Sequence, residues 1–470
     1  MLLFRWAAAS LVVSALWCAP ASGGGADTPQ QRLQSALAHY NSGAYAAAQQ
    51  ELESLERDVP HTFDAQELLG LVYSAEGQDE KATPRLEEAV RLKPDSGAAR
   101  NNLATNLAKV GKMSLAEAEF KKVVELEPAS YDANHNLGEF YIAKGDIAGA
   151  IPHLERAQKA NPAAYDNGYD LALAYEKTRR LREAEGQIRE LLKLKDTAEL
   201  HDLLADVEEE SGNYIVAENE YEKAAHADPS ESNIFDWGGE LLLHQTWGPA
   251  IQVFSAGLQR YPKSSRLAVG LGMAYYLQGR YDDAVKSLVR ATELAPADPN
   301  TYYFLTKAYD QSPNQADEVI QCFRRFAELR PNDGQAVLDY AVSLWKGKRS
   351  ETSSAYLDQI ESLLKKSIAL DPSSSQAHLQ LGNLYSQRKE YSQAVPEYQE
   401  AIKLSPDLAD AHFRLGQAYV HLGQKDLAQK ELQLHQRLYE RQLAETDKQR
   451  AELKQFVLSA KAAQSGPSGP

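Results

Sequence analysis

Small and apolar residues return at regular intervals along this chain, with polar residues between them. One unit of the pattern begins with Leu137-Gly138-x-x-Tyr141 and continues to Ala150 and Pro162. The same order recurs almost throughout three segments: 131–164, 265–298 and 375–408. Spacings of three and four residues within each unit are typical of helices that bury one face. Each unit therefore predicts two helices joined by a short turn.

Prolines mark the ends of these units, and most of them lie 34 residues apart or close to it. They are Pro60, Pro94, Pro128, Pro162, Pro229, Pro262, Pro296, Pro331, Pro372 and Pro406. An alanine lies twelve residues before most of these prolines: Ala48, Ala82, Ala116, Ala150, Ala217, Ala250, Ala284 and Ala394. Ala184 and Ala428 continue this series where the proline is missing, and Val319 and Ile360 are larger substitutes. A fixed period of this length predicts stacked helical repeats.

The residue types at the fixed positions have physical reasons. Gly138 and Ala150 are expected where the two helices of a unit cross, because only small side chains let two backbones approach closely. Gly145 follows the first helix, where a positive φ is needed and glycine adopts it without steric cost. The same reasoning applies to Gly77, Gly111, Gly212, Gly279 and Gly423. One unit cannot bury its apolar face alone, so neighbouring units must stack.

These motifs resemble the tetratricopeptide-repeat (TPR) family over residues 30–442. Members of this family fold as all-α, α-α superhelical solenoids, and the chain is expected to contain about twelve 34-residue helix-turn-helix repeats. The resemblance is to the exported bacterial type, because such repeats are common in exported bacterial proteins.

Three places depart from the repeat. Residues 347–359 lengthen the tenth repeat and are interpreted as a turn insertion, with a specific contact loop as the alternative. In the seventh repeat, Trp237 and Trp247 replace the usual leucine and tyrosine and are interpreted as core residues. Residues 425–463 predict one long charged helix that caps the last repeat, with a dimerising coiled coil as the alternative. Residues 464–470 are expected to be a disordered tail.

The N-terminus resembles a secretory signal peptide. Arg5 precedes an apolar run that is too short to span a bilayer, and Ala19-Pro20-Ala21 offers small residues for cleavage. We therefore expect a signal peptide at 1–21, a flexible leader at 22–29, and export to the periplasm or the medium. The alternative is a lipoprotein acylated at Cys18.

Composition and charge disfavour several classes of partner. The formal net charge is −16, which disfavours nucleic acid because phosphate binding requires a basic surface. It also disfavours an anionic lipid surface. No later segment has 18 consecutive apolar residues, so no transmembrane helix is expected in the mature chain. Loss of Cys18 with the signal peptide would leave Cys322 alone, without a disulfide partner.

No constellation of residues predicts catalysis, a cofactor or a metal. Gly270-x-Gly272 lacks the third glycine of a dinucleotide loop and lies inside a repeat. His378 and His412 are 34 residues apart and share one repeat position, so they are interpreted as structural side chains. The repeats also leave no segment long enough for a catalytic domain. We therefore expect the protein not to be an enzyme.

The family resemblance implies a groove lined by the first helices, which holds an extended peptide or a partner helix. The candidate groove residues are Asn102, Asn136, Asp170, Tyr276, Tyr303, Lys307, Asn383 and Arg414. Asn102 and Asn136 share one repeat position and are candidates for holding a peptide backbone. Asp170 and Asp206 bring acid to the middle repeats, so a neutral or basic peptide is favoured.

The function expected from the sequence is a secreted or periplasmic scaffold or adaptor that binds a protein or peptide without catalysis. A structural or assembly factor at the cell envelope is the first alternative. The second is an accessory superhelix of a glycosyltransferase-like system, against which the missing catalytic domain argues. Neither the partner nor the oligomeric state can be predicted from the sequence.

Overall fold

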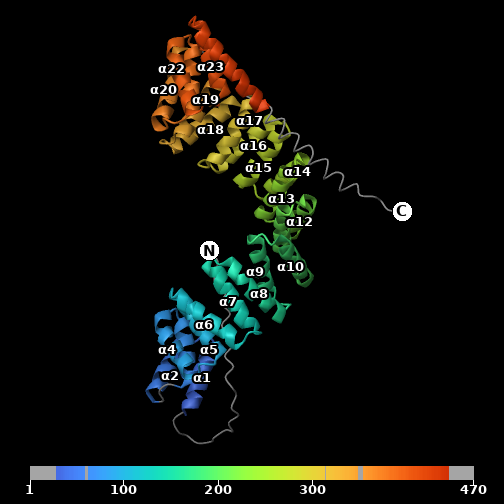
Figure 1. The fold of residues 1–470 in the computed structure, drawn as a ribbon, viewed down its shortest axis with the longest axis vertical. Coiled ribbons are helices and arrows are strands. Elements are labelled where there is room, and N and C mark those ends of the chain that lie inside the picture. Colours follow the sequence, from blue (N-terminus) through green and yellow to red (C-terminus); the bar gives the residue numbers. More distant parts are fainter. Residues whose placement is uncertain (1–27, 59–61, 313, 348–352, 444–470) are drawn as a thin grey trace, which may run out of the picture. The chain divides into compact units, whose positions relative to one another are not determined.

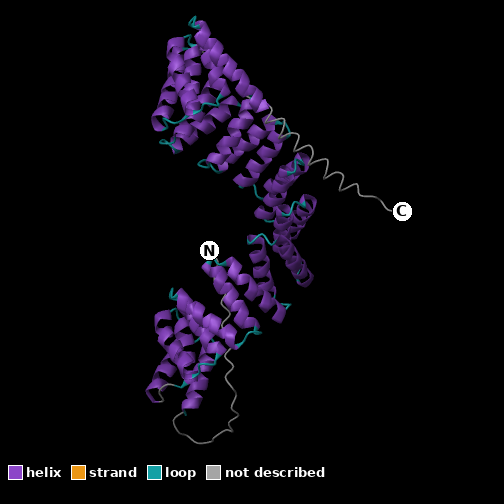
Figure 2. Cartoon of the chain, in the orientation of Figure 1, coloured by secondary structure: helices purple, strands orange, loops and turns teal. Residues whose placement is uncertain are grey.

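A computed structural model describes residues 28–58, 62–312, 314–347 and 353–443. Within these ranges the regular elements are helices joined by short turns, and no strand occurs (Figure 2). The expected signal peptide and the tail at 464–470 lie outside the described residues, as do most of the expected leader and the part of the C-terminal helix beyond residue 443.

The chain divides into two compact units, residues 1–212 and 213–470 (Figure 1). The first unit contains α1 (Pro29–Asn41), α2 (Tyr45–Asp58), α3 (Phe63–Ala75), α4 (Asp79–Leu92), α5 (Gly97–Lys109), α6 (Met113–Leu126), α7 (Tyr131–Lys144), α8 (Ile147–Ala160), α9 (Tyr165–Lys177), α10 (Leu181–Leu194) and α11 (Ala198–Glu210).

The second unit contains α12 (Tyr214–Ala227), α13 (Glu231–Leu243), α14 (Trp247–Arg260), α15 (Ser265–Leu277), α16 (Tyr281–Leu294), α17 (Pro299–Gln311), α18 (Ala316–Leu329), α19 (Gly334–Gly347), α20 (Ser354–Leu370), α21 (Ser375–Gln387), α22 (Tyr391–Leu404) and α23 (Ala409–His421). A further helix covers 425–443. In chain order the described helices alternate between the two helices of the repeat, and within each unit they stack in succession, which confirms the predicted fold class.

Within each unit, a helix packs mainly on the helices before and after it in the chain. Serine begins many of the first helices. The Ser130 hydroxyl accepts a hydrogen bond from the Ala133 amide at 3.3 Å, and this N-cap satisfies a backbone donor that the helix itself cannot. Equivalent caps begin α5, α13, α15 and α21: Ser96, Ser230, Ser264 and Ser374.

The two helices of a repeat cross at the small residues, as predicted. A Cβ atom added to Gly138 would lie 2.5 Å from Leu154 Cδ2, so only glycine fits against this leucine. Ala150 is fully buried at the same crossing. The same close approach occurs at Gly70, Gly272, Gly382 and Gly416, each against the side chain sixteen residues later. Val319 and Ile360, the larger substitutes, are also fully buried.

The turn between the helices of a repeat requires a left-handed residue. Gly145 has a φ of 84°, and positive φ is found as predicted at Gly77, Gly111, Gly212, Gly279 and Gly423. Three repeats use other residues at the same position: Arg179 (φ 61°), Gln245 (φ 61°) and Lys389 (φ 63°). The backbone of these three residues adopts a left-handed conformation that is sterically unfavourable for most residues other than glycine.

The motif tyrosine bridges successive repeats as well as filling space. The Tyr175 hydroxyl donates a hydrogen bond to Glu155 Oε1 at 2.8 Å. Glu155 lies in the second helix of the preceding repeat. Tyr73 donates to Glu53 in the same way, also at 2.8 Å. The sequence motif did not reveal this role, because the acceptor lies outside the motif.

Two departures from the repeat differ from expectation. The insertion at 347–359 was expected to be a turn, and its middle, residues 348–352, lies outside the described residues. Gly347 ends α19 and Ser354 begins α20, so the last part of the insertion is helical. Because of this addition α20 has 17 residues. Tyr356 fixes the added turn by donating to the Leu344 carbonyl oxygen at 2.6 Å. The leader was expected to reach residue 29, but Pro29 already belongs to α1, after the Thr28 cap.

The two tryptophans of the seventh repeat are only partly buried. Both are half-buried, and Trp237 packs against the apolar core of the second unit. The indole Nε1 atoms of Trp237 and Trp247 are shielded from solvent and have no hydrogen-bond acceptor. Trp237 thus contributes to the core as expected, although neither tryptophan is fully buried.

Candidate binding faces

The first helices of neighbouring repeats contact one another along much of each unit, and we call the surface they form the first-helix face. In the first unit α3 contacts α5, α5 contacts α7 and α7 contacts α9. In the second unit α13 contacts α15 and α15 contacts α17, and α21 contacts α23. The repeat motif does not specify the side chains on this face, because the fixed small and apolar residues point into the repeat.

Amide side chains link neighbouring first helices in the first unit. Asn102 Nδ2 donates to Glu67 Oε1 at 3.1 Å, and Asn136 Nδ2 donates to Asn101 Oδ1 at 2.8 Å. All four residues are buried. The two asparagines predicted to hold a peptide backbone therefore already have partners within the protein, and a bound peptide would have to share them.

Four carboxylates gather beyond this amide row, and we call them the acidic patch: Asp132 and Glu139 on α7, and Asp166 and Asp170 on α9. Asp132 and Asp166 are exposed, whereas Glu139 and Asp170 are partly buried. Within the described residues no lysine or arginine forms an ion pair with any of the four. His135 also lies beside the patch, with its Nε2 3.6 Å from Glu139 Oε1.

Burial and mutual repulsion change the ionisation of the acidic patch. Burial, with Asp170 and Asp166 nearby, raises the pKa of Glu139 to about 7. Burial and the charge of Asp166 raise the pKa of Asp170 to about 6. Burial lowers the pKa of His135, so this ring is not a strong cation. Glu139 Oε2 is also buried without a hydrogen-bond donor. The patch therefore lacks the positive charge that would balance it.

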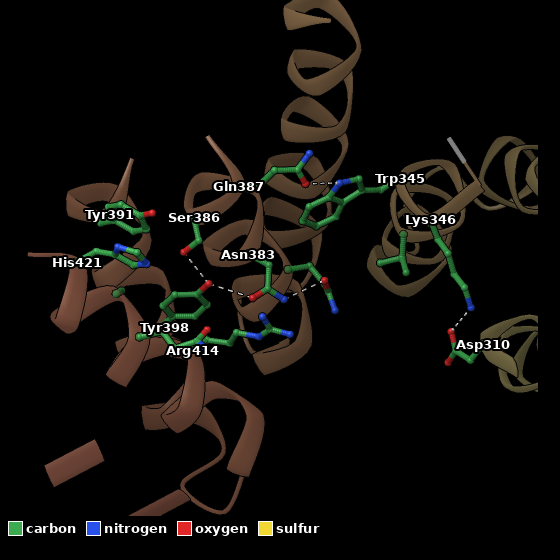
Figure 3. Close-up of a pocket in the computed structure, with 14 residues that line it drawn as sticks. Asp310, Trp345, Lys346, Asn383, Ser386, Gln387, Tyr391, Tyr398, Arg414 and His421 are labelled. Atoms are coloured by element: carbon green, nitrogen blue, oxygen red, sulfur yellow. Dashed lines mark hydrogen bonds and ion pairs between the residues drawn. The ribbon is translucent and has the colours of Figure 1, made fainter. Parts of the chain in front are cut away.

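In the second unit, two of the predicted residues, Asn383 and Arg414, line one cavity of about 770 Å³ (Figure 3). Asn383 Oδ1 accepts from the Tyr398 hydroxyl at 3.0 Å, and Asn383 Nδ2 donates to Gln380 at 3.3 Å. Trp345 lines the same cavity, and its Nε1 donates to Gln387 at 2.9 Å.

Charged groups around this cavity are paired. Lys346 Nζ lies 3.1 Å from Asp310 Oδ1, and Arg414 Nε lies 3.4 Å from Asp410 Oδ1. The cavity is therefore polar without a strong net charge. Sequence reasoning did not find Trp345 as a lining residue, because it occupies a variable repeat position with no motif to mark it.

The remaining predicted residues lie on α15 and α17. Tyr303 is 58% exposed, and Lys307 Nζ lies 5.5 Å from the centre of its ring. Tyr276 is half-buried and packs edge-on against Tyr281 at 5.6 Å. The structure thus places Tyr303 beside Lys307 and Asn383 with Arg414, but it does not gather all eight predicted residues into one site.

The two histidines interpreted as structural each contact a glutamate of the paired second helix. His378 Nδ1 lies 2.7 Å from Glu397 Oε2, and His412 Nδ1 lies 2.6 Å from Glu431 Oε2. Cys322 is a free, partly buried thiol whose Sγ accepts from the Thr292 hydroxyl at 3.2 Å. None of the helices in the described ranges has the length and apolar composition needed to cross a bilayer.

A chain of paired helices that pack mainly on their neighbours is a helical-repeat solenoid. Family models described as "TPR repeat" match residues 272–312 and 382–423. Others described as "Tetratricopeptide repeat" match 33–97, 101–165, 141–207 and 363–395. The chain belongs to the tetratricopeptide-repeat family. This family has a scaffold fold that is typical of protein-binding adaptors.

Several solved structures are similar to this chain. The complex described as Naa15/Naa10 bound to HypK-THB matches with 18% identity and a TM-score of 0.40, over 86% of this chain and 68% of that one. YrrB, described as a TPR protein with an unusual peptide-binding site, matches with 15% identity and a TM-score of 0.36, over 39% and 94%. Yeast Tom70 matches with 15% identity and a TM-score of 0.33, over 85% and 96%. No curated protein matches this chain.

Proposed function

We propose that this protein is an exported, non-catalytic scaffold that holds a basic segment of another protein against the acidic patch of its first unit. The observation that carries this proposal is the pair Glu139 and Asp170. Burial and repulsion from neighbouring carboxylates raise the pKa values of both groups, and no lysine or arginine among the described residues pairs with either. A lysine or arginine from a partner would supply the missing charge.

The position of the patch supports a role in recognition rather than in folding. Glu139 and Asp170 lie on α7 and α9, on the face whose side chains the repeat motif does not specify. Unbalanced carboxylates that are partly desolvated cost stability. A scaffold gains affinity for a cation from such a site, because the partner relieves the repulsion when it binds. Export is proposed from the N-terminal residues 1–21.

The test is the binding of a labelled peptide of alternating lysine and serine to the mature chain, measured by fluorescence anisotropy between pH 5 and pH 8. Both carboxyl groups are charged above pH 7, where we expect the strongest binding. As the pH falls, protons first neutralise Glu139, with its pKa of about 7, and then Asp170, with its pKa of about 6. Affinity should therefore fall by about tenfold by pH 5, as two charge contacts are lost.

The double variant Glu139→Gln with Asp170→Asn should bind about tenfold more weakly at pH 8 and lose the pH dependence. A matched control, Glu125→Gln with Glu190→Gln, removes the same charge from α6 and α10. These two side chains are 64% and 67% exposed and form local pairs with lysines. If the control weakened binding as much as the double variant, net charge rather than the patch would be responsible and the proposal would fail.

A further inference from the structure

An apolar groove lies on the first-helix face of the second unit, between α13 and α15. We call it the α13–α15 groove, and its volume is about 580 Å³. Its apolar lining consists of Phe235, Leu242 and Leu243 of α13 and Val269, Met273 and Leu277 of α15. It lies on the face where the sequence predicted a groove, but none of the eight predicted groove residues lines it.

The groove exposes large apolar side chains to solvent. Leu243 is 69% exposed and Leu277 is 41% exposed. These leucines end α13 and α15, so they lie at the same end of the groove. Adjacent exposed leucines in a groove are typical of a surface that is covered by a partner.

Glycines shape this groove. A Cβ atom at Gly270 would lie 2.6 Å from the Phe254 ring, so the fully buried ring packs directly beneath α15. A Cβ atom at Gly239 would meet no atom within 4 Å, although Gly239 lines the groove. The repeat fold therefore does not require glycine at 239, and a larger side chain there would occupy space that is now open.

The other end of the groove carries more negative than positive charge. Arg266 lines it, with its guanidinium carbon 4.3 Å from the centre of the Phe235 ring. Arg266 Nε lies 3.9 Å from Glu231 Oε1, and its charge acts on Asp236, whose pKa is raised by burial. Asp298 lines the groove as well. Glu231 and Asp236 thus lie near the one guanidinium, and Asp298 adds a third carboxylate to the lining of the same groove.

We propose that the α13–α15 groove binds an amphipathic helix of a partner protein. The apolar face of that helix covers Leu243 and Leu277, and a lysine or arginine at its other end pairs with the carboxylates around Arg266. From Phe235 to Leu243 the groove follows α13 for about two turns, or ~12 Å. A helix of two to three turns presents apolar side chains at three- and four-residue spacing over that distance. The inference extends the proposed protein-binding function to a separate site in the second unit.

The test uses a labelled helical peptide of leucines spaced three and four residues apart, with lysine at the other positions. Binding is measured by fluorescence anisotropy in the Glu139→Gln and Asp170→Asn background, so that the acidic patch does not contribute. We expect Gly239→Leu to weaken binding at least tenfold by filling the groove. The matched control is Gly186→Leu on α10, where an added Cβ also meets no atom within 4 Å, and it should leave binding unchanged.

The charge at the end of the groove is tested by a second peptide with glutamate in place of every lysine. It should bind at least tenfold more weakly than the lysine peptide. Equal binding of the two peptides would overturn the predicted charge preference, and equal binding by the Gly239→Leu and Gly186→Leu variants would overturn the site itself. The lysine–serine peptide, tested on Gly239→Leu with the acidic patch intact, should bind normally. This measurement distinguishes failure of the groove proposal from failure of the acidic-patch proposal.

Discussion

At the scale of single residues, the turn position of each repeat combines a fixed backbone conformation with a variable side chain. Most repeats place glycine there, but Lys389 holds a φ of 63°. Its side chain is exposed, so it gains little packing in return. The left-handed conformation costs a residue with a Cβ about 1–2 kcal/mol.

We therefore expect Lys389→Gly to stabilise the surrounding repeats by about 0.5–1 kcal/mol, since glycine's greater freedom in the unfolded chain offsets part of the gain. Thermal unfolding of the two proteins, followed by circular dichroism, measures the difference. The reverse change at the same position of the next repeat, Gly423→Lys, should be destabilising by a similar amount. A loss of stability in Lys389→Gly would mean that the lysine makes a contact worth more than the strain.

Residue-level prediction from sequence succeeded where a motif fixes the role and failed where contacts cross repeats. The positive φ of the turn glycines followed from the residue type alone. Asn102 and Asn136 were assigned to a ligand because they share a repeat position. Their bonds to Glu67 and Asn101 were not foreseen, since each partner lies about one period earlier in the chain.

At the scale of elements, the close crossing of the two helices in a repeat depends on a glycine, which has no side chain to separate them. The Gly138 backbone approaches the fully buried Leu154 side chain, so an added Cβ would force this leucine to shift. An extra methyl group in such a site costs about 1–3 kcal/mol by overpacking.

Gly138→Ala should therefore destabilise the α7–α8 pair by about 1–2 kcal/mol, even though alanine is the better helix former. Urea unfolding followed by circular dichroism measures this change. Gly186→Ala provides the comparison, because its Cβ meets no atom within 4 Å. That variant should be stabilised by about 0.5–1 kcal/mol through helix propensity alone. Similar effects in the two variants would show that helix propensity, not the crossing, dominates.

The tenth repeat shows what period analysis cannot predict about an element. The insertion was recognised because it interrupts the 34-residue spacing, and a turn was the simplest reading. The structure instead lengthens α20 to 17 residues. The reason is local: Tyr356 reaches the Leu344 carbonyl oxygen, which ties the added turn to α19. A single hydrogen bond from a tyrosine hydroxyl cannot be predicted from the repeat pattern.

At the scale of the whole molecule, each helix packs mainly on its sequence neighbours. The stability of such a chain is approximately a sum of terms for repeats and for their interfaces. Damage at one crossing is therefore expected to spread only to adjacent repeats. The number of repeats and the fold class could be predicted from the sequence because every repeat uses the same pair of packed helices with the same small residues at their crossing.

Hydrogen exchange of Gly138→Ala tests this locality. Amide exchange should accelerate in α7 and α8 and in the adjoining helices α6 and α9. It should stay at the wild-type rate in α21–α23, which belong to the second unit. Uniform acceleration across the chain would instead indicate that the molecule unfolds as one cooperative body.

Recognition was less predictable than fold at this scale. The acidic character of the middle repeats was visible in Asp170. The α13–α15 groove was not, because Leu243 and Leu277 look like ordinary apolar positions until their exposure is known. The sequence pattern predicts which positions lie on helices, but it does not predict which apolar helix faces remain exposed to solvent.

The separation between the residues that cross within a repeat and those on the first-helix face has an evolutionary consequence. Loss or duplication of a whole 34-residue unit would join one Gly-Leu crossing to another of the same kind, and the core would still close. The same event would change the order of the recognition side chains along the face. Unequal recombination between repeats within the gene can therefore change the binding partners of this protein, and each intermediate sequence would still encode a chain that folds.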